Sequence, residues 1–186
     1  MDENVFENLN EEERAMAQTL AGTASALLEN GVLTLAEIRG VSHDQLEAVY
    51  RVGFGLYNAG KYDDAEKLFR FLCVFQHTDP KYWVAMGAVR AARKNYAEAV
   101  KAYATASMFD CNLPKPHYYA AQCFLAMGDY DSAESGVVSL LELCPAGDPT
   151  NNKYRALATA LREKIAALRK AKELRGDVDP AEKAKA

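Results

Sequence analysis

Histidine and cysteine are the residue types in this 186-residue chain best suited to metal or nucleophilic chemistry. They are His43, His77, His117, Cys73, Cys111, Cys123 and Cys144. The chain has no His-Glu-x-x-His motif and no Cys-x-x-Cys pair, so the spacing predicts neither a zinc site nor a redox pair. Cys73 has apolar neighbours in Leu72-Cys73-Val74, and on this pattern we expect four reduced thiols in the core. No catalytic residue, metal site or cofactor is predicted.

Three further patterns contain the residue types that bind ions. Gly53-Phe54-Gly55 superficially resembles a phosphate loop, but no Gly-Lys follows it, and close packing between two helices explains the glycine better. Glu11-Glu12-Glu13 follows Asn10, and acids at that place favour the start of a helix. The basic stretch from Lys164 to Arg175 is typical of a solvated helix face, with a docking surface as the alternative. These patterns indicate a binding protein rather than an enzyme.

The composition is that of an acidic globular protein. The chain has 22 Lys and Arg against 26 Asp and Glu, a net charge of −4, and 49% of its residues are hydrophobic. This balance disfavours binding by neutralisation of phosphates, so no nucleic-acid partner is expected. No apolar run approaches the roughly 20 residues of a membrane span, so we expect no membrane insertion. The acidic start Met1-Asp2-Glu3-Asn4 differs from a secretory signal, and a cytoplasmic protein is expected.

The strongest pattern in the chain is an internal period of 34 residues that repeats three times. The aligned columns are Tyr62, Tyr96 and Tyr130; Ala65, Ala99 and Ala133; Gly53, Gly87 and Ala121; Phe69, Tyr103 and Val137; and Leu72, Ala106 and Leu140. This period and these residue types are those of the tetratricopeptide repeat, in which each unit is a pair of helices. We therefore predict an all-α solenoid of three helix pairs, with units at 46–79, 80–113 and 114–147.

Helical caps are predicted at both ends of the repeats. Residues 1–45 contain a helix from Asn10 to about Gly31, followed by capping boxes at Thr34-Leu35-Ala36-Glu37 and Ser42-His43-Asp44-Gln45. The two boxes start a short connecting helix and the first repeat helix. Residues 148–175 form an amphipathic capping helix, and residues 176–186 form a flexible tail. The apolar positions of the capping helix are Tyr154, Leu157, Leu161, Ile165 and Leu168.

The first helix of each unit is expected to line a concave binding groove with its second, fifth, ninth and twelfth positions. These positions hold Glu47, Tyr50, Phe54 and Tyr57, then Lys81, Val84, Ala88 and Ala91, then Lys115, Tyr118, Gln122 and Leu125, with Tyr119 beside them. Aromatic side chains at both ends of a floor of small residues make an apolar trough with charges at its rim. Such a trough suits an extended peptide that contains proline and leucine, bound with an affinity of about micromolar.

Two alternatives concern the aromatic side chains of this groove. Tyr50, Phe54 and Tyr57 could instead pack beneath the N-terminal helix. We expect them in the groove because other residues already supply the interior of the first unit, namely Val49, Val52, Gly53 and Leu56. A clamp for a peptide carboxylate would need polar or cationic groups where Tyr50, Phe54 and Tyr119 stand, so that mode of binding is not expected.

Several segments of the chain resemble a known family, including Leu-Cys-Val and Ala-Glu-Ser-Gly sequences that the 34-residue period does not require. They are Leu46 to Tyr57, Gly60-Lys61-Tyr62 with Ala65, Leu72-Cys73-Val74 with His77 and Asp79, Ala120-Ala121-Gln122-Cys123, and Ala133-Glu134-Ser135-Gly136. Through them the sequence resembles the class II chaperones of bacterial type III secretion systems over about residues 10–170. A generic tetratricopeptide scaffold that joins other proteins is the alternative.

The resemblance implies a function. Members of this family hold two hydrophobic translocator proteins in the bacterial cytosol before secretion, and take a Pro-x-Leu-x-x-Pro-like client segment into the groove. Tyr50, Phe54 and Tyr57 match the groove pockets, with Leu72 and Tyr119 as further walls. The N-terminal helix often mediates homodimerisation in this family, which here implicates Met16, Leu20, Ala24 and Leu27.

Overall fold

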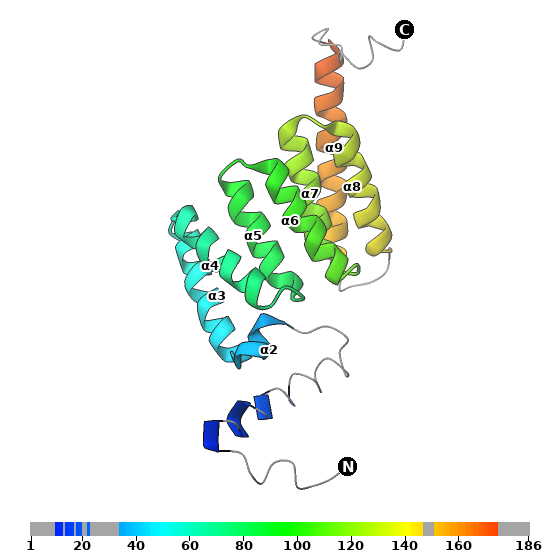
Figure 1. The fold of residues 1–186 in the computed structure, drawn as a ribbon. Coiled ribbons are helices and arrows are strands. Elements are labelled where there is room, and N and C mark those ends of the chain that lie inside the picture. The colour runs from blue at the N-terminus through cyan, green and yellow to red at the C-terminus, as the bar shows by residue number, and fades with distance from the viewer. Residues whose placement is uncertain are drawn as a thin grey trace, which may run out of the picture. The chain divides into compact units, whose positions relative to one another are not determined.

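The computed structural model describes residues 10–12, 14–16, 18, 19, 22, 34–146 and 151–174. Within these ranges every regular element is an α-helix, so the predicted all-α fold class is confirmed. The chain divides into two compact units, Met1–Thr78 and Asp79–Ala186, each with its own packed helices (Figure 1). Most of the predicted helix from Asn10 to Gly31 and the predicted tail from residue 176 lie outside the described residues.

The first unit contains α2 (Leu35–Arg39), α3 (His43–Asn58) and α4 (Tyr62–Phe75). Both predicted capping boxes are present. The Thr34 hydroxyl accepts a hydrogen bond from the Glu37 backbone N–H at 3.3 Å, and the Glu37 carboxylate accepts one from the Thr34 N–H at 2.7 Å. Ser42 and Gln45 make the same reciprocal pair at 3.3 and 2.9 Å. These bonds satisfy backbone donors that the helix itself leaves free, and thereby fix where α2 and α3 begin.

Close packing of α3 on α4 depends on Gly53. A Cβ atom at this position would lie 2.9 Å from Cε1 of Phe69, a side chain that is 1% exposed. The phosphate-loop pattern around Gly53 is thus a packing contact inside a helix. Val52 was predicted in the interior, but the structure leaves it 58% exposed. Adjacent side chains of an α-helix point about 100° apart. Because Gly53 faces α4, the side chain of Val52 points away from the interior.

The described residues of the second unit, 79–146 and 151–174, form five helices. They are α5 (Pro80–Ala92), α6 (Tyr96–Phe109), α7 (Pro114–Met127), α8 (Tyr130–Leu143) and α9 (Asn152–Leu174). Pro80 and Pro114 open α5 and α7, where proline's missing N–H costs no helical hydrogen bond. Each helix packs against the next along the chain, and α7 also contacts α5 and α9. The limits predicted for the repeats, at 46–79, 80–113 and 114–147, stay a prediction.

The predicted close contacts at the glycine and alanine column also occur in the second unit. A Cβ atom on Gly87 would lie 2.5 Å from Cε1 of Tyr103. In the third repeat the facing residues are smaller, and a Cβ on Gly136 would lie 3.0 Å from the Cβ of Ala121. Small residues on one helix therefore face larger or equally small ones on its partner, which keeps each pair of helices in close contact.

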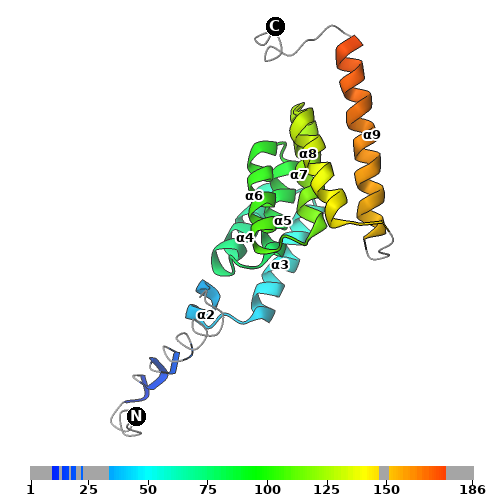
Figure 2. The same ribbon diagram turned by 90° about the vertical axis from the view of Figure 1, so that its right-hand side faces the viewer.

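The C-terminal helix α9 packs along α8, and its C-terminal end projects past the α7–α8 pair (Figures 1 and 2). Leu161 and Ile165 are buried, as the predicted amphipathic pattern requires, and Ala158, which was not predicted, is buried with them. Leu168, another predicted position, is 39% exposed. Two ion pairs of 2.7 Å join the helices, from Arg162 to Glu134 and from Arg169 to Asp131, and the Arg155 guanidinium donates to the Cys144 carbonyl at 2.9 Å.

The four cysteines do not share one environment. Cys73, Cys123 and Cys144 are buried, but Cys111 is exposed, so the prediction of four core thiols was wrong at that position. Cys111 lies in the turn between α6 and α7, where the Asp110 carboxylate accepts a hydrogen bond from the Asn112 backbone N–H at 3.0 Å. Polar groups on both sides hold this turn at the surface. Burial raises the pKa of the Cys123 thiol to about 11.

In the part of the chain that the structure describes, no helix is long and apolar enough to cross a membrane. The same residues contain no cluster of three or more His, Cys, Asp or Glu side chains placed to hold a metal ion.

Candidate peptide-binding site

The three predicted aromatic residues of α3 form a continuous row on one face of the helix. The Phe54 ring stacks on Tyr50 with centroids 6.3 Å apart and on Tyr57 with centroids 6.4 Å apart. Their spacing of four and three residues places the side chains one above the other. Phe54 is 49% exposed, and the two tyrosines are half-buried. The row thus presents an apolar surface to solvent.

Aromatic side chains of α4 support both ends of this row. Tyr50 lies 5.7 Å from the ring of Phe69, and Tyr57 lies 5.6 Å from the ring of Tyr62, each pair in a tilted arrangement. Tilted and offset ring pairs are the favoured geometries, so the row is held before any ligand arrives. The structure thereby places Tyr50, Phe54 and Tyr57 together, as the sequence predicts.

Leu72 was predicted as a further wall of the groove, and the structure contradicts this. It is 0% exposed and belongs to the buried face of α4, with Phe69 and Cys73. Ala106 and Leu140, which occupy the same column of the 34-residue period, are also 0% exposed. The second helix of each repeat turns this column inward, so Leu72 stabilises the fold and offers no surface to a ligand.

In the second unit, α5 supplies a smooth surface of small side chains. Ala88 and Ala91 are half-buried, and neither carries a polar group. Val84 is only 8% exposed because it packs in a core cluster with Ala99 and Tyr103. Val84 therefore contributes little of the surface predicted for it, while the two alanines leave room for a backbone to approach.

The neighbouring helix α7 carries the polar and aromatic part of this surface. Tyr119 stacks on the buried Tyr103 at 5.7 Å, and Tyr118 lies 5.3 Å from Tyr119 in a tilted arrangement. Gln122 is exposed, and its Nε2 donates a hydrogen bond to the Tyr118 hydroxyl at 2.7 Å. Burial, and to a smaller degree Tyr119, raises the pKa of the Tyr118 phenol, which stays protonated at neutral pH. Leu125 is half-buried one turn further along.

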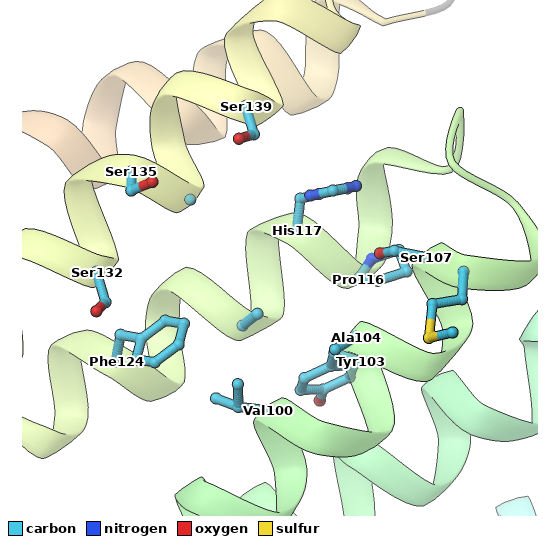
Figure 3. Close-up of a pocket in the computed structure, with 13 residues that line it drawn as sticks. Val100, Tyr103, Ala104, Ser107, Pro116, His117, Phe124, Ser132, Ser135 and Ser139 are labelled. Carbon is cyan, nitrogen blue, oxygen red and sulfur yellow. The ribbon is translucent and has the colours of Figure 1, made fainter.

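A hollow of about 510 Å³ lies among α6, α7 and α8 and was not predicted (Figure 3). Tyr103 and Phe124 form part of one wall, and the hydroxyls of Ser132, Ser135 and Ser139 line another. None of its 13 lining residues is an acid, a lysine or an arginine. Serines at spacings of three and four residues on α8 were the signal available in the sequence.

His117 also lines this hollow (Figure 3). Its Nε2 atom is buried and has no hydrogen-bond partner within the described residues. Burial lowers the pKa of the imidazole below its ordinary value of 6.5, so the neutral form predominates at neutral pH.

The chain is similar to several known proteins. A family model for the tetratricopeptide repeat matches residues 46–79. "Low calcium response locus protein H" of Yersinia pestis is 34% identical over 141 residues, which are 76% of this chain and 82% of the relative. The solved structure of PcrH, a Pseudomonas aeruginosa protein, in complex with the chaperone binding region of PopD is 39% identical, with a TM-score of 0.65, and covers 70% of this chain and 97% of that one. This chain belongs to the class II type III secretion translocator chaperones.

A third similarity supports that assignment. The type III secretion translocator chaperone SycD of Yersinia enterocolitica, solved as an alternative dimer, is 33% identical with a TM-score of 0.65 and covers 69% of this chain and 97% of that one. Membership of this family confirms the predictions of a tetratricopeptide fold and of a chaperone that is not an enzyme. The aromatic row of α3 and the α5–α7 surface are the candidate binding surfaces of this chaperone.

Proposed function

We propose that this chaperone binds hydrophobic translocator proteins in the bacterial cytoplasm and keeps them soluble until secretion. The observation that carries the proposal is the exposed, pre-arranged row of Tyr50, Phe54 and Tyr57. Solved complexes of its relatives support it, namely PcrH with the chaperone binding regions of PopD and of PopB, and SycD with a peptide of the translocator YopD.

The client segment proposed for these surfaces is extended and of the Pro-x-Leu-x-x-Pro type. Proline and leucine side chains fit between aromatic rings, and proline limits the conformational entropy that an extended peptide loses on binding. Each buried apolar anchor contributes about 1.5–3 kcal/mol before the cost of association. The affinity that we propose for the whole segment is about micromolar. The proposed contact residues are Tyr50, Phe54, Tyr57, Ala88, Ala91, Tyr118, Tyr119, Gln122 and Leu125.

A homodimer formed through the N-terminal segment is part of the proposal. Met16 is 67% exposed in the single chain. A residue that contacts a second copy must be exposed in this way before the dimer forms. Leu20, Ala24 and Leu27, the other predicted contacts, lie outside the described residues. The dimer of the SycD relative supports a homodimer, and its formation through the N-terminal segment stays a proposal.

Co-expression separates this function from that of a generic scaffold. A type III translocator that is insoluble alone is produced with this chaperone, with Phe54→Ala and with Val52→Ala. Val52 is exposed on the same helix but outside the aromatic row, so it is the matched control. We expect soluble translocator with wild type and Val52→Ala, and a clear loss with Phe54→Ala. A translocator that stays insoluble beside well-folded wild-type protein contradicts the proposal.

A further inference from the structure

Gln122 and Tyr118 form a polar pair on the otherwise apolar α5–α7 surface. Their side chains are joined by the 2.7 Å hydrogen bond from Gln122 Nε2 to the Tyr118 hydroxyl. Neither side chain takes part in another hydrogen bond among the described residues. The Gln122 amide has a second N–H and a carbonyl oxygen left over, and the Tyr118 hydroxyl can still donate its own proton. The exposed side of this pair therefore offers both a donor and an acceptor.

This property does not depend on which way the amide is turned. If the nitrogen and oxygen of Gln122 exchange places, the Tyr118 hydroxyl donates to the oxygen instead. The amide then keeps a free lone pair on its oxygen and both of its N–H groups. In either orientation Tyr118 holds one polar atom of the amide by a hydrogen bond. The amide still offers at least one N–H donor beside an oxygen acceptor.

A residue of an extended chain requires that combination when its backbone leaves water, because its N–H and C=O point to the same side. An extended chain has no internal backbone hydrogen bonds, and a backbone N–H or C=O that is buried without a partner costs free energy. Among the proposed contact residues, Ala88 and Ala91 on α5 and Leu125 on α7 carry no polar side-chain group that could supply one. They do leave space, because small side chains let a backbone come close to the helices.

We propose that the Gln122 amide, held in place by Tyr118, hydrogen-bonds the backbone N–H and C=O of one residue of the client segment. This inference rests on the proposed function, since it assigns a role within the same binding surface. Gln122 contacts the backbone of the peptide and not one of its side chains. It therefore fixes the register of the peptide, while the apolar contacts select its sequence. The proline residues have no N–H, so the contact falls on one of the four positions that separate them.

Backbone methylation of the peptide, combined with substitution of Gln122, tests the proposal. The probe is a fluorescein-labelled dodecapeptide centred on Pro-Ala-Leu-Ala-Ala-Pro, with four versions that are each N-methylated at one non-proline position. Binding to wild type and to Gln122→Met is measured by fluorescence anisotropy. We expect Gln122→Met to lower the affinity for the unmodified peptide about tenfold, which is the effect of losing one or two hydrogen bonds. One of the methylated peptides is expected to bind wild type with about tenfold lower affinity than the unmodified peptide does. On Gln122→Met the same methylation should lower the affinity less than about threefold.

Two tyrosine variants give matched controls. Tyr118→Phe keeps the ring and removes the hydroxyl that holds the amide, and we expect a loss of about threefold. Tyr96→Phe removes the hydroxyl of a half-buried tyrosine on α6, outside the proposed contact residues, and we expect no change in affinity. Circular dichroism checks that each variant is folded.

The outcomes separate this inference from the function on which it rests. If wild type binds the peptide and Tyr57→Ala weakens it, but Gln122→Met binds as wild type does, only the backbone contact is overturned. The same holds if every methylation costs equally on wild type and on Gln122→Met. If folded wild-type protein binds no peptide, both the proposed function and the contact fall.

Discussion

Gly87 faces Tyr103 so closely that a Cβ atom on the glycine would lie 2.5 Å from Cε1 of the tyrosine. Tyr103 is 1% exposed and belongs to the core cluster of the second unit, so its ring has little room to move. The contact joins α5 to α6. It makes the absence of a side chain at residue 87 a condition for the packing of this repeat.

Gly87→Ala is accordingly expected to lower the free energy of unfolding by about 1–3 kcal/mol, the usual cost of overpacking a core. Gly55→Ala is the control, because a Cβ at Gly55 meets no atom within 4 Å. Alanine there is expected to stabilise α3 by about 0.5–1 kcal/mol. Urea denaturation followed by circular dichroism measures both. Equal effects of the two substitutions would show that the Gly87 contact is not limiting.

The C-terminal helix should be held by its apolar face more than by its ion pairs. Ile165 is 1% exposed, and Ile165→Ala is expected to cost about 2–5 kcal/mol of stability. The Arg162 side chain is 55% exposed, and such pairs contribute about 0–1 kcal/mol in water. Thermal denaturation should therefore show a large fall in melting temperature for Ile165→Ala and a small one for Arg162→Ala. A larger fall for the arginine variant would reverse the order of these two contributions.

Thiol reactivity should follow burial. Alkylation requires the thiolate and access to it. In the native protein at pH 8, iodoacetamide is expected to modify Cys111, which is exposed, and to leave Cys123 unmodified, because that thiol is buried with a pKa raised to about 11. Mass spectrometry of tryptic peptides locates the modification. Rapid labelling of Cys123 before Cys111 would contradict the burial described for α7.

The burial of His117 predicts a dependence of stability on pH. Its pKa in the folded protein is below the ordinary value of 6.5, so the unfolded chain takes up the proton first as the pH falls. Acidification from pH 7.5 through 6.5 therefore favours the unfolded state. His117→Gln should lose this part of the pH dependence, as measured by urea denaturation at pH 7.5 and pH 5.5. An unchanged difference between the two pH values would show that His117 does not contribute.

The sequence predicts features that depend on local spacing. The capping boxes at Thr34 and Ser42 follow from residues three apart, and the contacts of Gly53 and Gly87 follow from the 34-residue period. The row of Tyr50, Phe54 and Tyr57 follows from helical spacing together with the assigned groove positions.

What the sequence does not predict depends on the detailed directions of side chains between helices. Leu72 was expected to line the groove but is buried. The expectation came from the family resemblance, which matches residues without showing which way their side chains point. Cys111 was expected in the core, but it falls in a turn only one residue beyond the end cap of α6. The hollow beside His117 and the bond between Gln122 and Tyr118 arise from three-dimensional packing and rotamers, which periodicity does not determine.

The central claim is that the aromatic row of α3 binds a client segment, and a fluorescence-anisotropy titration with a labelled Pro-x-Leu-x-x-Pro peptide tests it most directly. Saturable binding by wild type is expected, with Tyr57→Ala weaker by about 1–3 kcal/mol and equally helical by circular dichroism. Val52→Ala should bind as wild type does. Absence of binding by the folded wild-type protein, or equal binding by a folded Tyr57→Ala, would contradict the claim.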